Sequence, residues 1–361
     1  MEFTSVRYDV RAGTDYNHPF GRLLPTIDHE DILLLPKIPN LEVEVWTLVR
    51  QIPGGRVATY GDIARAMGDV SASRFVGEVM MNHDHNDQCV CHRVVRSDGT
   101  LGKFISGVLA DKQVRLENEQ VQVVNEAVVL GEFGFNDFSS DAPLFRLKEY
   151  QDEVAQSVEV TQPLNHIPDR IGGIDVSFVP NSNRGVAAFV EVDVVNGTVV
   201  YSRMFEDEIR FPYVSGYLAY RELPLLQTLL TEVIAERELP VVTLVDGSGV
   251  LHPRRAGVGA MLGVAMGMRT IGVTKKHLIG KVDISGLTNG ESREIHVGDG
   301  ADEHLAGFAM LPGSGTMKPI YISPGHLIDA QSSLAVLQRC LLGRRLPEPI
   351  YWADRLSRDA T

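Results

Sequence analysis

The chain has 361 residues, with 34 basic and 47 acidic side chains and a formal net charge of −13. A length above twice the ~150 residues of an average domain predicts two domains, and 44% hydrophobic with 22% charged residues excludes wholesale disorder. The net acidity by itself disfavours a nucleic-acid partner, although a local groove can be basic on an acidic protein.

Three further features of the sequence indicate the cellular compartment. No run of about 18 uncharged apolar residues is present, so we expect no transmembrane helix and no membrane partner. The first residues lack a basic region followed by an apolar stretch, so we expect no secretory signal. Three cysteines cannot form a disulfide framework and are typical of a reducing compartment, which predicts a cytoplasmic protein. No obligate protein partner is evident.

The first half of the chain predicts short helices. Residues 42–51 form a candidate helix that Pro53-Gly54-Gly55 stops. Thr59 is a plausible N-cap for a helix over 60–67, and Ser71 can cap a second helix through Met81. Two short helices around a glycine-containing turn are a helix-turn-helix candidate, a pattern that most often has nothing to do with DNA.

The second half predicts a mixed α/β domain. After the acidic stretch 131–142 we expect a helix, three strands, a helix and a strand: 147–158, 171–179, 186–194, 198–205, 222–236 and 241–245. This order implies an α/β fold with a mixed sheet and flanking helices. We therefore divide the chain into domains over 1–125 and 143–361, with a linker over 126–142.

Carboxylates mark two of these strands. Asp175 is placed at the end of its strand, Asp246 ends the strand from 241, and Glu222 begins a helix. An acidic residue beside an apolar strand is costly unless it faces an open edge or a cation. For either Asp alone a capped loop carboxylate is an equal alternative. Together, the three oxygen ligands predict Mg²⁺, with Mn²⁺ as a substitute.

Several motifs over 143–361 resemble endonuclease V, in the order found in that family. They are FPYVSGYLAYRE (211–222), VDGSGVLHPRR (245–255), IGVTK (271–275), SPGH (323–326), RLPEP (345–349) and ADRL (353–356). The resemblance implies a ribonuclease-H-like fold and cleavage of nucleic acid at the second phosphodiester 3′ to a deaminated base, chiefly hypoxanthine. Since some relatives prefer RNA, an inosine-directed ribonuclease stays an alternative.

The same resemblance assigns roles to six residues. Asp175 and Asp246 would be metal ligands, and Glu222 a direct or water-mediated ligand. His252 would orient or deprotonate the attacking water, and Lys275 would stabilise phosphate charge. Tyr213 would be a wedge beside the lesion. A core aromatic is the alternative for Tyr213, but Pro212 and Gly216 place it on a turn. Ser215 departs from the family, which usually has a second proline there.

The informative stretch of the first half is CHRVVRSDG over 91–99. Cys91 stands beside a histidine and two arginines, a field that favours the nucleophilic thiolate. The alternative is a buried structural cysteine, the more common fate of a single Cys. Cys340, within an apolar helical pattern, is expected to be such a core residue.

The region 41–124 resembles the methylated-DNA–protein-cysteine methyltransferases. The match comprises VRQIP (49–53), VATYGDIA (57–64), Arg74, VG (76–77), Asn82 and CHRV (91–94). The resemblance implies that Cys91 accepts an alkyl group from guanine O6, that His92 reaches it through water, and that Glu119 orients His92. It places the helix from Ser71 in the minor groove, with Tyr60, Arg74 and Asn82 as DNA-binding residues.

Two segments depart from this second family. Residues 83–90 replace an apolar strand that ends in Ile-Pro, and residues 104–108 replace a Tyr-Ser-Gly-Gly loop. Both changes touch the alkyl pocket. The two resemblances together predict a bifunctional DNA-repair protein that acts on hypoxanthine-containing and O6-alkylguanine-containing DNA. The alternative, that the first half only binds lesions and delivers the nuclease, is disfavoured by the presence of Cys91.

The segment before Cys91 also offers zinc ligands, namely His83, His85, Cys89, Cys91 and His92. Their spacing is not a standard zinc knuckle, and a metal on Cys91 would block alkyl acceptance. We therefore expect a solvated polar loop and no zinc.

Overall fold

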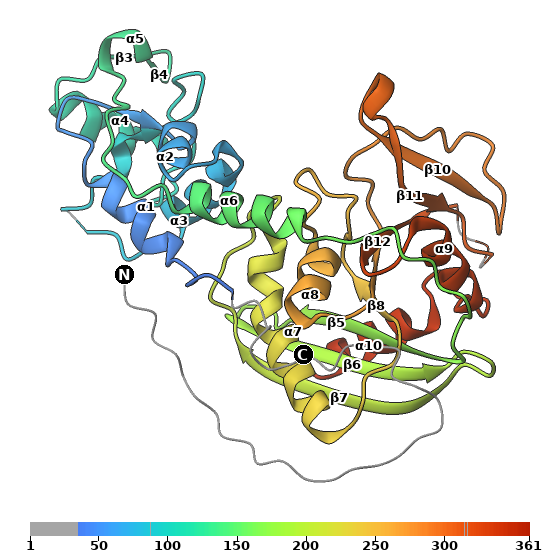
Figure 1. Ribbon diagram of the computed structural model, residues 1–361. Helices are drawn as coiled ribbons and strands as arrows, with labels where there is room; N and C mark the ends of the chain where they lie inside the picture. Colours follow the sequence, from blue (N-terminus) through green and yellow to red (C-terminus); the bar gives the residue numbers. More distant parts are fainter. Residues whose placement is uncertain (1–34, 87, 314, 316) are drawn as a thin grey trace.

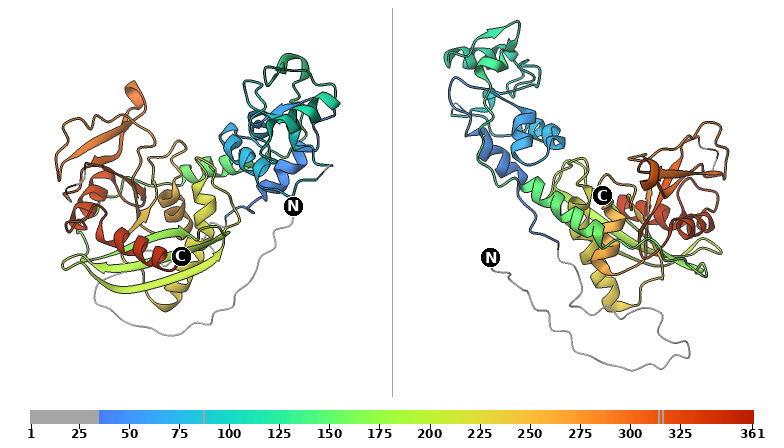
Figure 2. Two further views of the ribbon diagram at one scale, coloured as in Figure 1. Left: turned by 180° about the vertical axis from the view of Figure 1, so that it is seen from behind. Right: turned by 45° about the horizontal axis from the view of Figure 1, so that its top comes forward.

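The computed structural model describes residues 35–86, 88–313, 315 and 317–361. Residues 1–34, which open the first predicted domain and carry the expected absence of a secretory signal, lie outside that range. Figure 1 shows a smaller N-terminal half and a larger C-terminal half, with helix α6 (Pro143–Gln156) lying between them, and the views of Figure 2 agree. Within the described residues, no helix combines the length and apolarity that a membrane crossing needs.

Short elements make up the N-terminal half. In chain order they are α1 (Leu41–Val49), β1 (Ala58–Thr59), α2 (Tyr60–Ala66), η1 (Val70–Ala72), α3 (Ser73–Met81), η2 (Cys91–Arg93), β2 (Val94–Val95), α4 (Leu109–Asn118), β3 (Val123–Val124), β4 (Ala127–Val128) and α5 (Leu130–Phe133). Strands β1 and β2 pair in parallel. Since Tyr60 follows β1 and Cys91 precedes β2 by three residues, the pairing brings both functional candidates to one region.

The predicted helix-turn-helix is present, with one correction. Thr59 caps α2 through a reciprocal capping box with Asp62, as its residue type predicts. Ser71, in contrast, is not the cap of the second helix. Asp69 accepts a hydrogen bond from the Ser71 amide and begins the 3₁₀ turn η1, and α3 begins at Ser73. Asp69 caps the 3₁₀ turn through the Ser71 amide, and α3 continues from that turn without a side-chain cap of its own.

The C-terminal half is built on one large mixed sheet. Its elements after α6 are β5 (Arg170–Phe178), β6 (Arg184–Asp193), β7 (Thr198–Glu208), α7 (Leu218–Glu236), β8 (Thr243–Asp246), α8 (Val258–Met266), β9 (Thr270–Thr274), β10 (Ser292–Val297), η3 (Gly300–Asp302), β11 (His304–Met310), β12 (Ile320–His326), α9 (Ala330–Arg339) and α10 (Glu348–Asp359). In the described part of the chain the strand order is β10-β11-β12-β9-β8-β5-β6-β7, with β5, β8 and β9 parallel. The predicted mixed α/β fold is confirmed.

Helices cover both faces of this sheet. One apolar cluster joins the sheet to α7 and α8, and a second joins it to α9 and α10 (Figure 1). Gly173 in β5 lies directly under α10, where a Cβ atom would overlap the carbonyl of Pro349. The absence of a side chain lets α10 approach the strand closely, which brings its C-terminal part to the position of Asp175.

Asp175 does not end its strand, although the predicted strand bounds of 171–179 agree with those of β5. Strand β5 continues to Phe178 because Val176, Ser177 and Phe178 pair with β6 on one side. On the other side, pairing with β8 stops at Ile174. Asp175 therefore lies inside β5 but beside an open edge. This edge leaves room for the carboxylate, as the end of a strand would have done.

The predicted linker over 126–142 contains β4 and α5. Val128 packs in an apolar cluster with Val57, Val95 and Leu101 of the N-terminal half. The start of this segment is thus attached to the first half, and the division into domains stays a prediction.

Candidate active sites

One pocket collects the candidates of the second half. It measures ≈ 970 Å³, and among its lining residues are Asp175, Tyr213, Glu222, Asp246, His252 and Lys275. These side chains come from β5, α7, β8 and the segments after Phe211, Asp246 and Thr274. All six candidates that the sequence placed in this half therefore face a common space.

The buried carboxylates of this pocket repel one another. Asp175 and Asp246 lie on the same face of neighbouring strands, one residue beyond the paired Ile174 and Val245. Burial, followed by the charge of Asp246, raises the pKa of Asp175 to about 6. Burial and the same two aspartates raise the pKa of Glu222 well above its usual value. Carboxyl groups held this way in a pocket are suited to a divalent cation, so the donor set fits Mg²⁺ or Mn²⁺.

Helix α10 adds contacts to this pocket that the sequence did not predict. Ser357 Oγ donates a hydrogen bond of 2.9 Å to Asp175 Oδ2. Lys275 Nζ lies 2.7 Å from Asp246 Oδ2 and 3.8 Å from Asp354 Oδ1, and Arg358 also pairs with Asp354. The ADRL motif contained Asp354, but nothing in its pattern indicated that it would lie beside the lysine.

His252 is buried and neutral. Burial and the positive charge of Arg254 lower its pKa to about 4. Its Nδ1 accepts a hydrogen bond from the Arg254 amide at 3.3 Å, and a backbone hydrogen bond at Gly216 engages the ring as well. A neutral imidazole has one accepting nitrogen, and here it is occupied. Of the two predicted roles, this geometry supports orientation and disfavours removal of a proton from water.

The turn that carries Tyr213 is fixed at its end. Tyr213 is 57% exposed, as its place between Pro212 and Gly216 predicts. The Gly216 carbonyl accepts hydrogen bonds from Arg254 and, at 3.2 Å, from Gln151 Nε2. Gln151 in α6 in turn accepts from Arg254 Nε at 2.6 Å. An exposed aromatic ring on a fixed turn can enter a base stack without any rearrangement of the turn.

The N-terminal half also reaches this pocket. Asp69 and Ser71, which belong to the turn before the helix with Arg74, are among its lining residues. Arg74 is exposed and pairs only loosely with Glu78, at 3.3 Å, and Asn82 Nδ2 donates to the Glu78 carbonyl at 2.9 Å. The turn before the candidate DNA-binding helix thus lines the same pocket as the candidate nuclease site.

One of the two predicted partners of His92, Glu119, is in direct contact with it. His92 Nε2 lies 2.9 Å from Glu119 Oε1, and Arg93 holds the same carboxylate at 2.7 to 3.1 Å. His92 Nδ1 is buried and has no protein partner among the described residues. Burial lowers the pKa of His92, so the ring is neutral at pH 7. Two of the three candidates, His92 and Glu119, are therefore in direct contact.

The environment of Cys91 differs from the predicted thiolate field. Its side chain is 3% exposed, and a hydrogen bond with Cys89 together with burial raises its pKa. The nearby cations Lys112 and Arg115 act in the opposite sense, but less strongly. Lys112, which sequence reasoning missed, is buried and donates a hydrogen bond of 2.6 Å to the Val94 carbonyl. Tyr60 is part-buried close to Cys91, whose charge contributes to raising its pKa, after the larger effect of burial.

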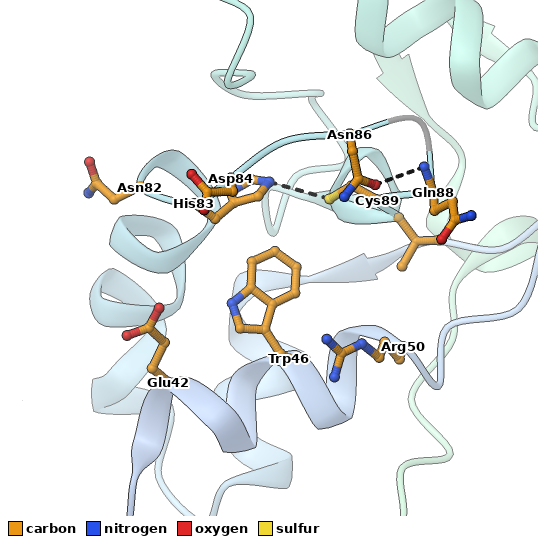
Figure 3. A pocket seen from close by; sticks show the side chains of 10 residues that line it. Glu42, Trp46, Arg50, Asn82, His83, Asp84, Asn86, Gln88 and Cys89 are labelled. Carbon is orange, nitrogen blue, oxygen red and sulfur yellow. Dashed lines mark hydrogen bonds between the residues drawn. The ribbon is translucent and has the colours of Figure 1, made fainter.

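The solvated loop predicted before Cys91 is present on one side only. Asn82, Asp84 and Asn86 are exposed, whereas His83 and His85 alternate with them and are half-buried. His83 packs edge-on against Trp46 with ring centroids 4.8 Å apart (Figure 3). Aromatic packing turns the histidines inward, toward the two cysteines. His92 points instead to Glu119 and is not part of this cluster.

Comparisons with known proteins match a different family to each half of the chain. A family model for endonuclease V matches residues 152–355, and a model for the DNA-binding domain of 6-O-methylguanine DNA methyltransferase matches residues 40–121. A bifunctional methyltransferase/endonuclease of Picrophilus torridus is 36% identical over 66% of this chain and 75% of its own length. One from Thermoplasma volcanium is 32% identical over 70% of this chain and 73% of its own.

Solved structures resemble the C-terminal half. The catalytic domain of human endonuclease V has a TM-score of 0.56 at 30% identity, covering 62% of this chain and 97% of its own. Endonuclease V of Ciona intestinalis, in complex with a DNA that contains an inosine followed by a ribo-adenosine, has a TM-score of 0.54 at 27% identity, covering 61% and 98%. The chain belongs to the endonuclease V family, in a fusion with the DNA-binding domain of the 6-O-methylguanine DNA methyltransferase family.

Proposed function

We propose that this chain repairs DNA in two ways. Its C-terminal half cleaves, with Mg²⁺ or Mn²⁺, the second phosphodiester 3′ to a deaminated base such as hypoxanthine. Its N-terminal half transfers an alkyl group from guanine O6 to Cys91. The observation that carries the first activity is the common pocket of Asp175, Glu222, Asp246, Lys275 and Tyr213. The DNA bound by the Ciona intestinalis relative supports a substrate that contains inosine.

In the nuclease half, Asp175 and Asp246 would hold the cation, with Glu222 as the further ligand. When bound, a divalent cation beside a phosphodiester supplies activation of water and neutralises developing charge. Lys275, whose side chain is 40% exposed, places a positive charge at the same edge, where it stabilises the phosphate oxygens. Neutral His252 keeps the segment after β8 in place. Tyr213 enters the base stack beside the lesion.

In the alkyltransferase half, the Cys91 sulfur attacks the alkyl carbon of O6-alkylguanine as a thiolate. An S–C bond forms and the C–O6 bond breaks, and the guanine leaves with the electron pair and takes up a proton. The Cys91 proton leaves through His92, whose unpartnered Nδ1 fits the water-mediated contact that the resemblance implies. Because the thioether is stable, each chain would act once.

A cleavage assay tests the nuclease half. Duplexes and single strands with one deoxyinosine should be cut in Mg²⁺ at the second phosphodiester 3′ to it, and strands with guanine there should not. The DNA bound by the Ciona intestinalis relative has a ribo-adenosine directly after the inosine. A 2′-hydroxyl should therefore be tested on the nucleotide that follows the lesion. Faster cleavage of an all-RNA inosine strand than of deoxyinosine DNA would replace a DNA-repair function with an inosine-directed ribonuclease.

Mass measurement tests the other half. After incubation with DNA containing O6-methylguanine, the intact protein should gain the mass of one methylene unit per chain, on the peptide with Cys91. Binding of this DNA without a mass gain would make the N-terminal half a lesion-binding module that delivers the nuclease.

A further inference from the structure

Four potential metal ligands converge ahead of η2. The side-chain ligand atoms of His83, His85, Cys89 and Cys91 all lie within 4.8 Å of one another. Cys89 Sγ is 3.3 Å from His83 Nε2, and Cys91 Sγ is 3.6 Å from His85 Nδ1. In tetrahedral zinc sites with Zn–S near 2.3 Å and Zn–N near 2.0 Å, bound sulfur and nitrogen atoms are roughly 3.5 Å apart. Both observed distances match that separation.

The surrounding structure holds these ligands in place before any ion binds. His83 packs on Trp46, His85 packs on Phe104 with ring centroids 5.4 Å apart, and the two imidazoles contact each other edge-on at 5.6 Å. Figure 3 shows His83 and Cys89 facing one another above the Trp46 ring. His83 Nδ1 is buried without a partner in the described chain, so the Nε2 side provides the polar contact of this ring. The cluster is therefore preorganised around its sulfur atoms.

The donor set identifies the metal. Two sulfur and two imidazole ligands in tetrahedral reach select zinc over magnesium or calcium, which prefer oxygen. The carboxylates of the nuclease pocket are a different set, and none of the four residues here lines that pocket. Four protein ligands also make a closed site of the kind that stabilises folded chains.

We propose that His83, His85, Cys89 and Cys91 bind one zinc ion. This site goes beyond the proposed function, since neither inosine cleavage nor alkyl acceptance calls for zinc, and it reverses the expectation from sequence that this segment binds no metal. The ion would attach His83, His85 and Cys89 to η2 and would hold the Cys91 sulfur as a thiolate, because a coordinating thiol is deprotonated.

Elemental analysis of the full chain, grown with zinc and purified in reductant, tests the site. We expect one zinc per chain in the wild type and in two controls, Asp246→Asn in the nuclease pocket and Cys340→Ala, which removes a buried cysteine remote from the cluster. Cys89→Ser and His85→Gln should lose the ion. Cys89→His, which replaces one ligand type with another, should retain zinc better than Cys89→Ser.

Cobalt substitution gives a readout that needs no variant. Co²⁺ added to the metal-free wild type should give thiolate-to-metal charge-transfer absorption, which the carboxylates of the nuclease pocket cannot produce. Zinc should then displace it. Absence of both zinc and this absorption in the wild type overturns the proposal, and so does zinc that persists in Cys89→Ser but is lost in Asp246→Asn. If Cys89→Ser fails to fold, the wild-type cobalt spectrum decides alone.

Discussion

The Tyr217 hydroxyl donates a 2.7 Å hydrogen bond to Asp69 Oδ2 and so joins the two halves of the chain. Tyr217 ends the turn of the candidate wedge and precedes α7, while Asp69 begins the turn before the candidate DNA-binding helix α3. Nearby, the Leu144 amide donates to the Met67 carbonyl at 2.8 Å. One apolar cluster contains Cys91, Tyr217 and residues of the large sheet. The halves therefore share a core rather than being joined by a free linker.

Tyr217→Phe should lower the free energy of unfolding. Removing a buried donor to a carboxylate costs about 1–3 kcal/mol. Tyr201→Phe is the matched control, because its hydroxyl donates at 2.9 Å to Glu236 on the surface and its loss should have a much smaller effect. Denaturant unfolding compares the two. Equal losses would mean that the contact between the halves contributes nothing beyond a surface hydrogen bond.

Asp246→Asn should abolish cleavage while leaving much of the DNA binding. The variant loses a metal ligand, but removing negative charge from the pocket reduces repulsion of phosphate. Asp207→Asn, an exposed carboxylate on β7, should retain full activity. Cleavage rates across a Mg²⁺ titration, together with binding measured in Ca²⁺, check both points. Wild-type activity of Asp246→Asn at saturating Mg²⁺ would remove Asp246 from the metal site.

Asp175 predicts how the metal-free chain responds to pH. Its pKa of about 6 in the folded chain lies above the ordinary 3.8. The folded state therefore binds this proton more tightly than the unfolded state does. The contribution of protonated Asp175 to the free energy of unfolding is complete below pH 4 and is lost as the pH rises through 6. Asp175→Asn removes the charge, and at pH 8 in chelator it should stabilise the chain by on the order of 2 kcal/mol.

The control for this experiment is the same substitution at pH 4, where the gain should vanish because wild-type Asp175 is already protonated. Thermal unfolding at both pH values measures it, and zinc is absent from both proteins in chelator. A destabilised Asp175→Asn at pH 8 would show that the hydrogen bond from Ser357 outweighs the repulsion from Asp246 and Glu222.

Five of the six candidates of the nuclease pocket could be predicted because each lies in a short motif whose residues are local in sequence, and Asp175 because it is an acidic residue in an apolar strand. The pocket's other members could not. Ser357 contacts Asp175 across 182 residues, and Gln151 reaches Arg254 across 103. Only the packing of α10 on Gly173 and of α6 against the wedge turn brings them there. The open edge beside Asp175 depends on unequal pairing of β5 with its two neighbours, which a single strand's pattern does not encode.

The clustering of the histidines and cysteines could not be predicted, for the same physical reason. The spacing of His83, His85, Cys89 and Cys91 resembles no standard zinc motif, so polarity suggested a solvated loop. The inward turn of the histidines depends on Trp46 and Phe104, which lie on α1 and in the segment before α4. Alternation of histidines with Asn82, Asp84 and Asn86 was the one signal in the sequence that indicated a buried and an exposed side.

Tyr213→Ala should reduce cleavage of inosine-containing duplex more than cleavage of an inosine-containing single strand. Unstacking a base costs a few kcal/mol. If the wedge offsets about 1.4 kcal/mol of this cost, its loss should slow duplex cleavage roughly tenfold. Tyr213→Trp, which keeps a large aromatic ring, should restore most of the difference. Equal losses on both substrates would assign Tyr213 to folding, although its exposure argues against such a role.

Zinc binding and alkyl acceptance would use the same Cys91 sulfur. The ion therefore has to be displaced as the alkyl group arrives instead of blocking its acceptance, and this predicts a stoichiometry. A thioether is a far weaker zinc ligand than a thiolate, so each methyl group transferred to Cys91 should release one zinc ion. Zinc-loaded protein is mixed with DNA containing O6-methylguanine, and a chromogenic chelator follows zinc while mass spectrometry follows the methyl group. Cys91→Ser should show neither event and should still cleave inosine DNA, because the nuclease pocket contains none of these ligands. Methyl transfer with zinc retained would show that the ion does not depend on the Cys91 thiolate. Zinc retained with no transfer would show that Cys91 is a structural ligand and not an alkyl acceptor.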